Sequence, residues 1–163
     1  MQVWQACGLA VLVVVLLAWA SRNEVMLWLS VVMALGWFCY NVPIWFLGFA
    51  ESGRFAPWTE GTAAMVVAAI GSQRRSWPAF VVLCLYGAEE VAMAAGHIVN
   101  GQGSYFHFAL LNGIFALRLF TVGGLSGAYL VAWLHGEHLL SWRDPLGWAR
   151  AIARPQGKTR GRG

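Results

Sequence analysis

Two adjacent carboxylates, Glu89 and Glu90, stand near the middle of an apolar segment, residues 78–99. An ionised carboxylate at the centre of a bilayer costs about 2.5–3.5 kcal/mol on insertion scales, so it needs a partner or a water-filled site. Arg118 is the obvious partner, because Glu89 lies 13 residues before Gln102 (102 − 89) and Arg118 lies 16 after it (118 − 102). In an antiparallel hairpin turning at Gln102 their depths differ by about one helical turn, roughly 5 Å. We predict that Arg118 pairs with Glu89 or Glu90 and leaves one acid unpaired.

This predicted intramembrane charge cluster has two interpretations. It could be a proton or cation relay, as intramembrane ionisable residues often are. It could instead be a salt bridge that locks two helices together. No further acidic residue continues a path through the apolar segments, which favours the salt bridge.

Histidines form a second candidate site. His97 and His107 each lie five residues from Gln102, on opposite sides of it, so they should share one level near the membrane surface. Histidines on facing helices can hold a haem or a metal in a bundle. No third ligand or haem-attachment motif accompanies them, so we expect no cofactor, with a redox subunit as the alternative. His135 and His138 are expected at the opposite end.

The sequence carries no enzyme motif. GxSxG, HExxH and P-loop patterns are absent, and the one aspartate, Asp144, lies outside the apolar segments. We therefore expect a non-enzymatic protein. Cys7, Cys39 and Cys84 show no CxxC pairing and are expected to be buried structural thiols.

The elements that must position these residues are membrane helices. Of the 163 residues, 59% are apolar and only 11% are charged, against roughly a quarter charged in an average soluble domain. Ten of the residues are Trp, whose amphipathic ring favours membrane–water interfaces. The composition predicts an all-α, polytopic transmembrane helical bundle.

Four segments are long and apolar enough to be firm spans, namely residues 7–20 (extending toward residue 1), 25–50, 78–99 and 105–140. A fifth, residues 57–72, is doubtful, and could be a tilted short span, a re-entrant arm or an interfacial helix. We expect residues 51–61 to form an interfacial loop. The last span would be roughly 50 Å long, so it must tilt, project from the membrane or break at Gly123-Gly124.

Three regions follow from this pattern. Residues 1–140 form the transmembrane helical domain, residues 141–154 an interfacial amphipathic segment, and residues 155–163 a disordered basic tail. The sequence Ala18-Trp19-Ala20 has the form of a signal-peptidase site. Because no basic residue precedes the first apolar segment, we expect an uncleaved first helix.

Charge distribution predicts the orientation. Six of the eleven basic residues lie after position 140, which indicates a cytoplasmic C-terminus by the positive-inside rule. The positive-inside rule does not decide between four and five spans, because both arrangements place the same number of basic residues on the cytoplasmic side. We expect a multi-pass protein of a bacterial inner membrane whose basic tail contacts anionic lipid headgroups. Beside long apolar segments, this basic region does not indicate nucleic-acid binding.

Small residues at four-residue spacing predict close helix packing. Such packing drives helix association in a membrane, because lipid is as apolar as the helices and the hydrophobic effect contributes little. They form one ridge at residues 88–96 and others at residues 123–136: Ala88, Ala92 and Gly96; Gly123 and Gly127; Gly124, Ala128, Ala132 and Gly136. The packing could be within one chain or between copies.

We therefore expect a component that self-associates or docks with other membrane subunits. In its size, its several spans and its basic tail, the chain resembles phage holins in composition, which implies pore formation. The alternative is a small ion-coupled transporter using Glu89, Glu90 and Arg118.

Overall fold

The computed structural model describes residues 3–47, 56–99 and 105–135, and these residues are helical apart from the turns between helices. There are five helices in the described part of the chain: α1 (Val3–Ala20), α2 (Glu24–Leu47), α4 (Ala56–Arg74), α5 (Trp77–Val99) and α6 (Tyr105–Leu134). The predicted all-α bundle is confirmed. The interfacial segment 141–154 and the basic tail lie outside the described residues.

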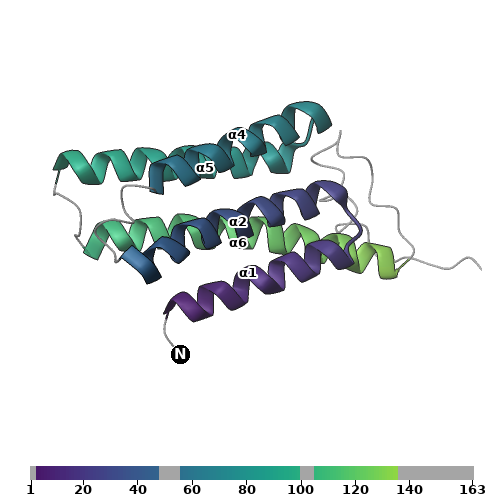
Figure 1. Ribbon diagram of the computed structural model, residues 1–163. Coiled ribbons are helices and arrows are strands. Elements are labelled where there is room, and N and C mark those ends of the chain that lie inside the picture. Colours follow the sequence, from purple (N-terminus) through teal and green to yellow (C-terminus); the bar gives the residue numbers. More distant parts are fainter. Residues whose placement is uncertain (1–2, 48–55, 100–104, 136–163) are drawn as a thin grey trace, which may run out of the picture.

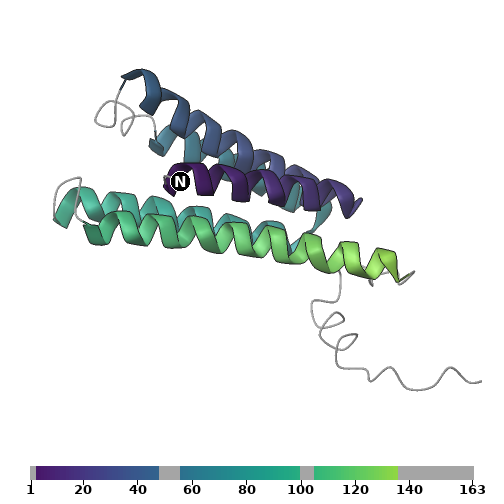
Figure 2. The ribbon, with the colours of Figure 1, turned by 90° about the horizontal axis from the view of Figure 1, so that it is seen from below.

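The helices form a closed ring in which each packs against its neighbours in the order α1, α2, α4, α5, α6 and back to α1. Figures 1 and 2 show that neighbours along the chain run antiparallel, whereas α1 and α6 run in the same direction. The α1–α2 turn, the α4–α5 turn and the end of α6 therefore lie at one end of the bundle (Figure 1). We call this the basic end, because Arg22, Arg74 and Arg75 belong to those turns.

The bundle has an apolar core and an apolar exterior. Fully buried side chains from all five helices fill the centre of the ring, among them Ala18, Met26, Leu29, Val67, Val82 and Val122. Large apolar side chains are also exposed on every helix, including Leu16, Trp28, Met65, Phe80 and Phe120. A soluble monomer rarely exposes so much contiguous apolar surface. This arrangement fits a bilayer as the surrounding solvent.

Three helical segments are long and apolar enough to cross a membrane: Glu24–Val42, Trp77–Gly96 and Ala109–Leu134. The apolar part of α1, Gln5–Ala20, is shorter. The chain is thus a membrane protein with long apolar helices in a bundle, and α1 and α4 complete the ring around them.

Helix α4 corrects the described part of the expected loop, residues 56–61, whereas residues 51–55 lie outside the described residues. Residues 57–72 lie within one unbroken helix of 19 residues, which is about 28 Å long. It packs against α2 and α5 inside the bundle. Pro57, whose sequence context predicts a loop, lies in the first helical turn, where its missing N–H removes no helical hydrogen bond.

Helix α6 is continuous through Gly123-Gly124, where a break was one of the expectations. Its 30 residues make it about 45 Å long, so it still exceeds a hydrocarbon core of roughly 30 Å. The expectation of buried cysteines was wrong for Cys39 and Cys84, which are exposed on the outside of the bundle.

Side-chain caps define both turns at the basic end. The Asn23 carboxamide oxygen accepts a hydrogen bond from the Met26 N–H at 3.1 Å, at the start of α2. The Ser76 hydroxyl accepts one from the Ala79 N–H at 3.5 Å, at the start of α5. Each pair has the N-cap-to-N3 spacing that satisfies an otherwise free helical N–H. Both helical hairpins are therefore closed by specific local contacts.

Candidate functional site

Arg118 is the most deeply buried charged residue in the described part of the chain, with an exposed fraction of 2%. Its Nη1 donates a hydrogen bond to Glu60 Oε2 at 2.8 Å, and its Nη2 donates one to Glu89 Oε2. The guanidinium carbon also lies 4.0 Å from the ring centre of Tyr86 and 5.5 Å from that of Phe115. Ion pairs and cation–π contacts thus stabilise one charge inside the bundle.

Helix geometry explains why Glu60 and Glu89 meet the same guanidinium. Glu60 lies 15 residues before Arg75 (75 − 60) and Glu89 lies 14 residues after it (89 − 75). At about 1.5 Å per residue, both lie roughly 21–23 Å from the α4–α5 turn. Arg118 reaches this level from α6, which packs against α5. The cluster therefore joins three helices at one depth.

Glu90 lies beside this pair in a different environment. Its Oε1 is buried and has no hydrogen-bond partner. A Cβ placed on Gly61 would lie 3.9 Å from that oxygen, so Glu90 approaches α4 where that helix has no side chain. The structure thus brings Glu89 into an ion pair with Arg118, while Glu90 lies next to α4.

Carboxylates outnumber the cation in this ion cluster, which we define as Glu60, Glu89, Glu90 and Arg118. Three carboxyl groups stand against one guanidinium, a sum of −2 when all four groups are ionised. Each uncompensated carboxylate in a bilayer core costs about 2.5–3.5 kcal/mol. The Arg118 Nε is also buried without a hydrogen-bond partner. The cluster could therefore accept a proton, a cation or a water molecule.

Glu60 was not among the predicted site residues, because its sequence context predicts a loop. The available signal was the hairpin spacing just described, since counting outward from Arg75 places Glu60 opposite Glu89. That count requires α4 and α5 to form an antiparallel pair, and α4 was the segment whose structure was doubtful. Predicting the complete ion cluster therefore required the structure of α4, the one helix that the sequence pattern did not assign.

The structure describes only part of the histidine candidates. His97 lies in α5 and His107 in α6, but their side chains lie outside the described residues, as does His138. His135 is exposed, and its Nδ1 lies 2.8 Å from the Val131 carbonyl oxygen. Among the described residues, no group of three or more His, Cys, Asp or Glu side chains is arranged to hold a metal ion.

The small residues of α6 face two different directions. A Cβ on Gly123 would lie 3.0 Å from Val14 Cγ2, so Gly123 lets α1 pack closely against α6. Gly124 and Ala128 are exposed, and a Cβ on Gly124 would have no neighbour within 4 Å. Of the remaining small residues, Ala92 and Ala132 are buried, Gly96 and Gly127 are partly buried, and Ala88 is exposed. Gly136 lies outside the described residues.

No family model matches the sequence, and no curated protein or solved structure matches it either. The interpretation of the site therefore depends on the geometry of this chain.

Removing the cation should strongly destabilise the bundle. We expect Arg118→Met to lower the free energy of unfolding in detergent by about 3–5 kcal/mol, because it leaves buried carboxylates uncompensated. Adding Glu60→Gln and Glu89→Gln should recover most of that loss. Denaturant titration followed by circular dichroism would measure both effects.

The matched control is Arg74→Met, which breaks the Arg74–Glu24 ion pair. Its two side chains are 53% and 57% exposed, so the change should stay within about 1 kcal/mol. Equal losses for the Arg118 and Arg74 variants would contradict a stabilising role for the buried cluster.

Proposed function

We propose that this chain is a small, non-enzymatic, multi-pass protein of a bacterial inner membrane that self-associates through the outer face of α1 and α6. One observation carries the proposal, namely the open small-residue face around Gly124. Gly123 is used inside the bundle against α1, whereas Gly124 and Ala128 face outward with open space beside Gly124. A second copy of the chain is the occupant that we propose, and docking with other membrane subunits is the alternative.

A groove between α1 and α6 supports this surface. It has a volume of about 450 Å³ and is lined by small and apolar residues that include Ala6, Ala10, Phe120 and Gly124. Ala6 and Ala10 are four residues apart on α1, as Gly124 and Ala128 are on α6. Small residues at this spacing let a further helix approach closely, which favours van der Waals contact in lipid.

The basic end supports a cytoplasmic C-terminus. Arg22 lies 4.8 Å from the ring centre of Trp133, so the α1–α2 turn and the end of α6 share one end of the bundle. Arg74 pairs with Glu24 there. The six basic residues after position 140 follow α6 from this end. The positive-inside rule then favours the cytoplasm for all of these charges.

Filling the open face should weaken association. We expect Gly124→Leu to raise the dissociation constant of the oligomer at least about fivefold, because overpacking costs about 1–3 kcal/mol. Analytical ultracentrifugation in detergent would measure the equilibrium. Gly87→Leu is the matched control, since Gly87 is exposed on α5 and a Cβ there also has open space. A monomeric parent protein, or equal weakening by both variants, would contradict the proposal.

A pore between copies is a narrower form of this proposal, and the geometry supports it less. The ion cluster lies inside one bundle, whereas the large exposed side chains between the basic end and the opposite end of the described helices are mainly apolar. A lumen between copies would therefore be lined by apolar groups. We expect the membrane potential to stay unchanged when the protein is expressed from an inducible promoter, as a potential-sensitive dye would report. Rapid depolarisation would instead support a holin-like pore.

A small ion-coupled transporter is the second candidate. It is favoured by the excess of carboxylates and by the buried, unpartnered oxygen of Glu90. Intramembrane carboxylates of this kind often take part in proton or cation movement. The transported ion would be a proton or a monovalent cation, exchanging at Glu90 while Arg118 holds Glu60 and Glu89.

This second candidate predicts that Glu90→Gln abolishes transport and leaves folded protein in the membrane. Proteoliposomes loaded with a pH-sensitive dye, under an imposed potassium potential, would measure proton flux. Glu24→Gln is the control, because Glu24 is exposed at the basic end. Flux equal to that of empty liposomes would exclude proton transport, and loss of folding in Glu90→Gln would indicate a structural role.

A further inference from the structure

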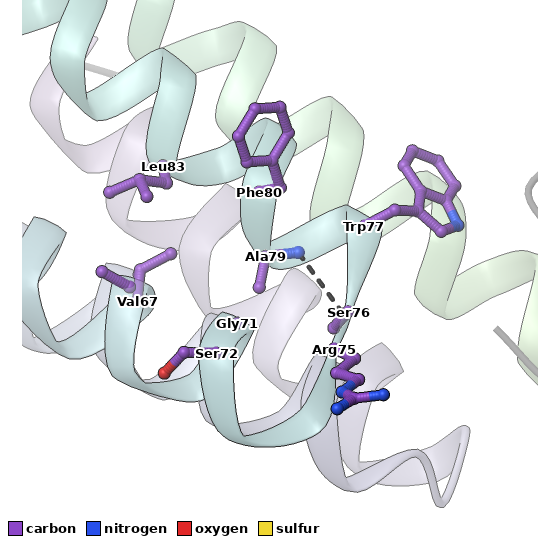
Figure 3. Close-up of a pocket in the computed structure, with 10 residues that line it drawn as sticks. Val67, Gly71, Ser72, Arg75, Ser76, Trp77, Ala79, Phe80 and Leu83 are labelled. Carbon is purple, nitrogen blue, oxygen red and sulfur yellow. Dashed lines mark hydrogen bonds between the residues drawn. The ribbon is translucent and has the colours of Figure 1, made fainter. Parts of the chain in front are cut away.

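A cavity of about 480 Å³ lies between α4 and α5, next to the turn that joins them. Its walls are mainly apolar and include Val67 and Ala68 from α4 and Phe80 and Leu83 from α5. Figure 3 shows Gly71 and Ala79 between these walls and the turn. Because α5 enters its apolar span at Trp77, the cavity runs from the membrane surface into the hydrocarbon region.

Arg75 lines the cavity at this turn. Its φ of 47° is left-handed, and the Ser76 N–H donates a hydrogen bond to the Gly71 carbonyl at 3.2 Å. This six-to-one bond is that of a Schellman C-cap, in which glycine is the usual left-handed residue. An arginine there carries backbone strain of about 1–2 kcal/mol. The strain points to a use for the guanidinium.

The other arginines of the basic end are already in contact with the chain. Arg22 has the same left-handed backbone, with φ of 54°, and stacks over Trp133. Arg74 pairs with Glu24 at 2.6 Å. Within the described residues, Arg75 has neither an ion pair nor a ring contact, and its side chain is exposed at the cavity. Its charge is thus available to a ligand.

We propose that this cavity binds one anionic phospholipid, with an acyl chain along the apolar walls and the phosphate at Arg75. Three features fit this ligand. The guanidinium complements a phosphate, the walls suit a hydrocarbon chain, and Trp77 lines the cavity at the level where amphipathic rings favour headgroups. The surrounding membrane supplies the lipid. This site is distinct from the lipid contacts that the sequence predicts for the basic tail.

Native mass spectrometry of the full chain in detergent would test the proposal. Titration with phosphatidylglycerol and with phosphatidylcholine of the same acyl chains would give the affinity for each bound lipid. We expect the parent protein to prefer phosphatidylglycerol at one site. We expect Arg75→Gly to lower that preference about fivefold, since one interfacial positive charge is lost. Glycine also suits the left-handed backbone, so this variant should fold at least as well.

Two further variants keep the test specific. Arg22→Gly removes a charge from the equivalent left-handed position and should leave the preference unchanged. Ala68→Phe should weaken binding of both lipids, because it fills the cavity. Glycerol phosphate, a headgroup without a chain, should not displace the bound lipid at equal concentration.

The proposal would be overturned by an unchanged preference in Arg75→Gly, which would assign anionic lipid to the basic tail. Equal losses in the Arg75 and Arg22 variants would likewise assign it to the charge of the whole basic end. Unaltered binding in Ala68→Phe, or displacement by glycerol phosphate, would show that the apolar cavity holds no acyl chain.

Discussion

The contact of one guanidinium with two carboxylates determines how α4, α5 and α6 fit together. In a bilayer, helices gain little from burying apolar surface against each other, because lipid is equally apolar. Polar contacts and close packing must therefore select the partner and its register. Arg118 does this for two helices at once, because Glu60 and Glu89 occupy the same level on α4 and α5. The helix that depends most on this contact is α4. It is absent from the candidate spans, and its buried Glu60 would be costly without Arg118.

The rest of the ring is held without buried charge. Helix α1 contacts α6 where Gly123 leaves room for Val14, and it contacts α2 where Gly8 faces Trp37. At the basic end, Asn23 and Ser76 cap the helices, and Arg22 stacks on Trp133. The bundle therefore has two regions with different physical support. Ion pairs hold α4, α5 and α6 together at the ion cluster, whereas small residues and helix caps stabilise the contacts of α1 and α2. A substitution at Gly123 and one at Arg118 would act through unrelated causes.

The sequence was sufficient for four of the five described helices and for one of the two ion pairs. Long apolar segments predicted the helices around Glu89 and Arg118, and counting from the turn between them predicted their contact. Glu60 could not be found in this way, because a proline and an acid in one short segment are also the pattern of a loop. Two features distinguish α4 from a loop. Pro57 is tolerated because it lies in a first helical turn, and Glu60 is stabilised by Arg118, which lies 58 positions away in the sequence. Which small residues face inward likewise depends on how the helices pack. Gly123 faces α1, whereas the adjacent Gly124 faces open space.

Stability alone does not account for the composition of the ion cluster. A buried ion pair can often be replaced by apolar residues with no loss of stability, so its usual value is in specifying an arrangement. Glu60 and Glu89 serve that role, since each fixes one helix against Arg118. Glu90 does not, because its buried oxygen has no partner and its removal would leave both ion pairs in place. An acid that costs insertion energy and holds no helix is the feature on which the proposed ion-coupled alternative depends. In a membrane interior, a proton is the ion that neutralises a carboxylate at the smallest cost in free energy. Glu90 is therefore the residue that distinguishes a purely structural salt-bridge cluster from an ion-binding site.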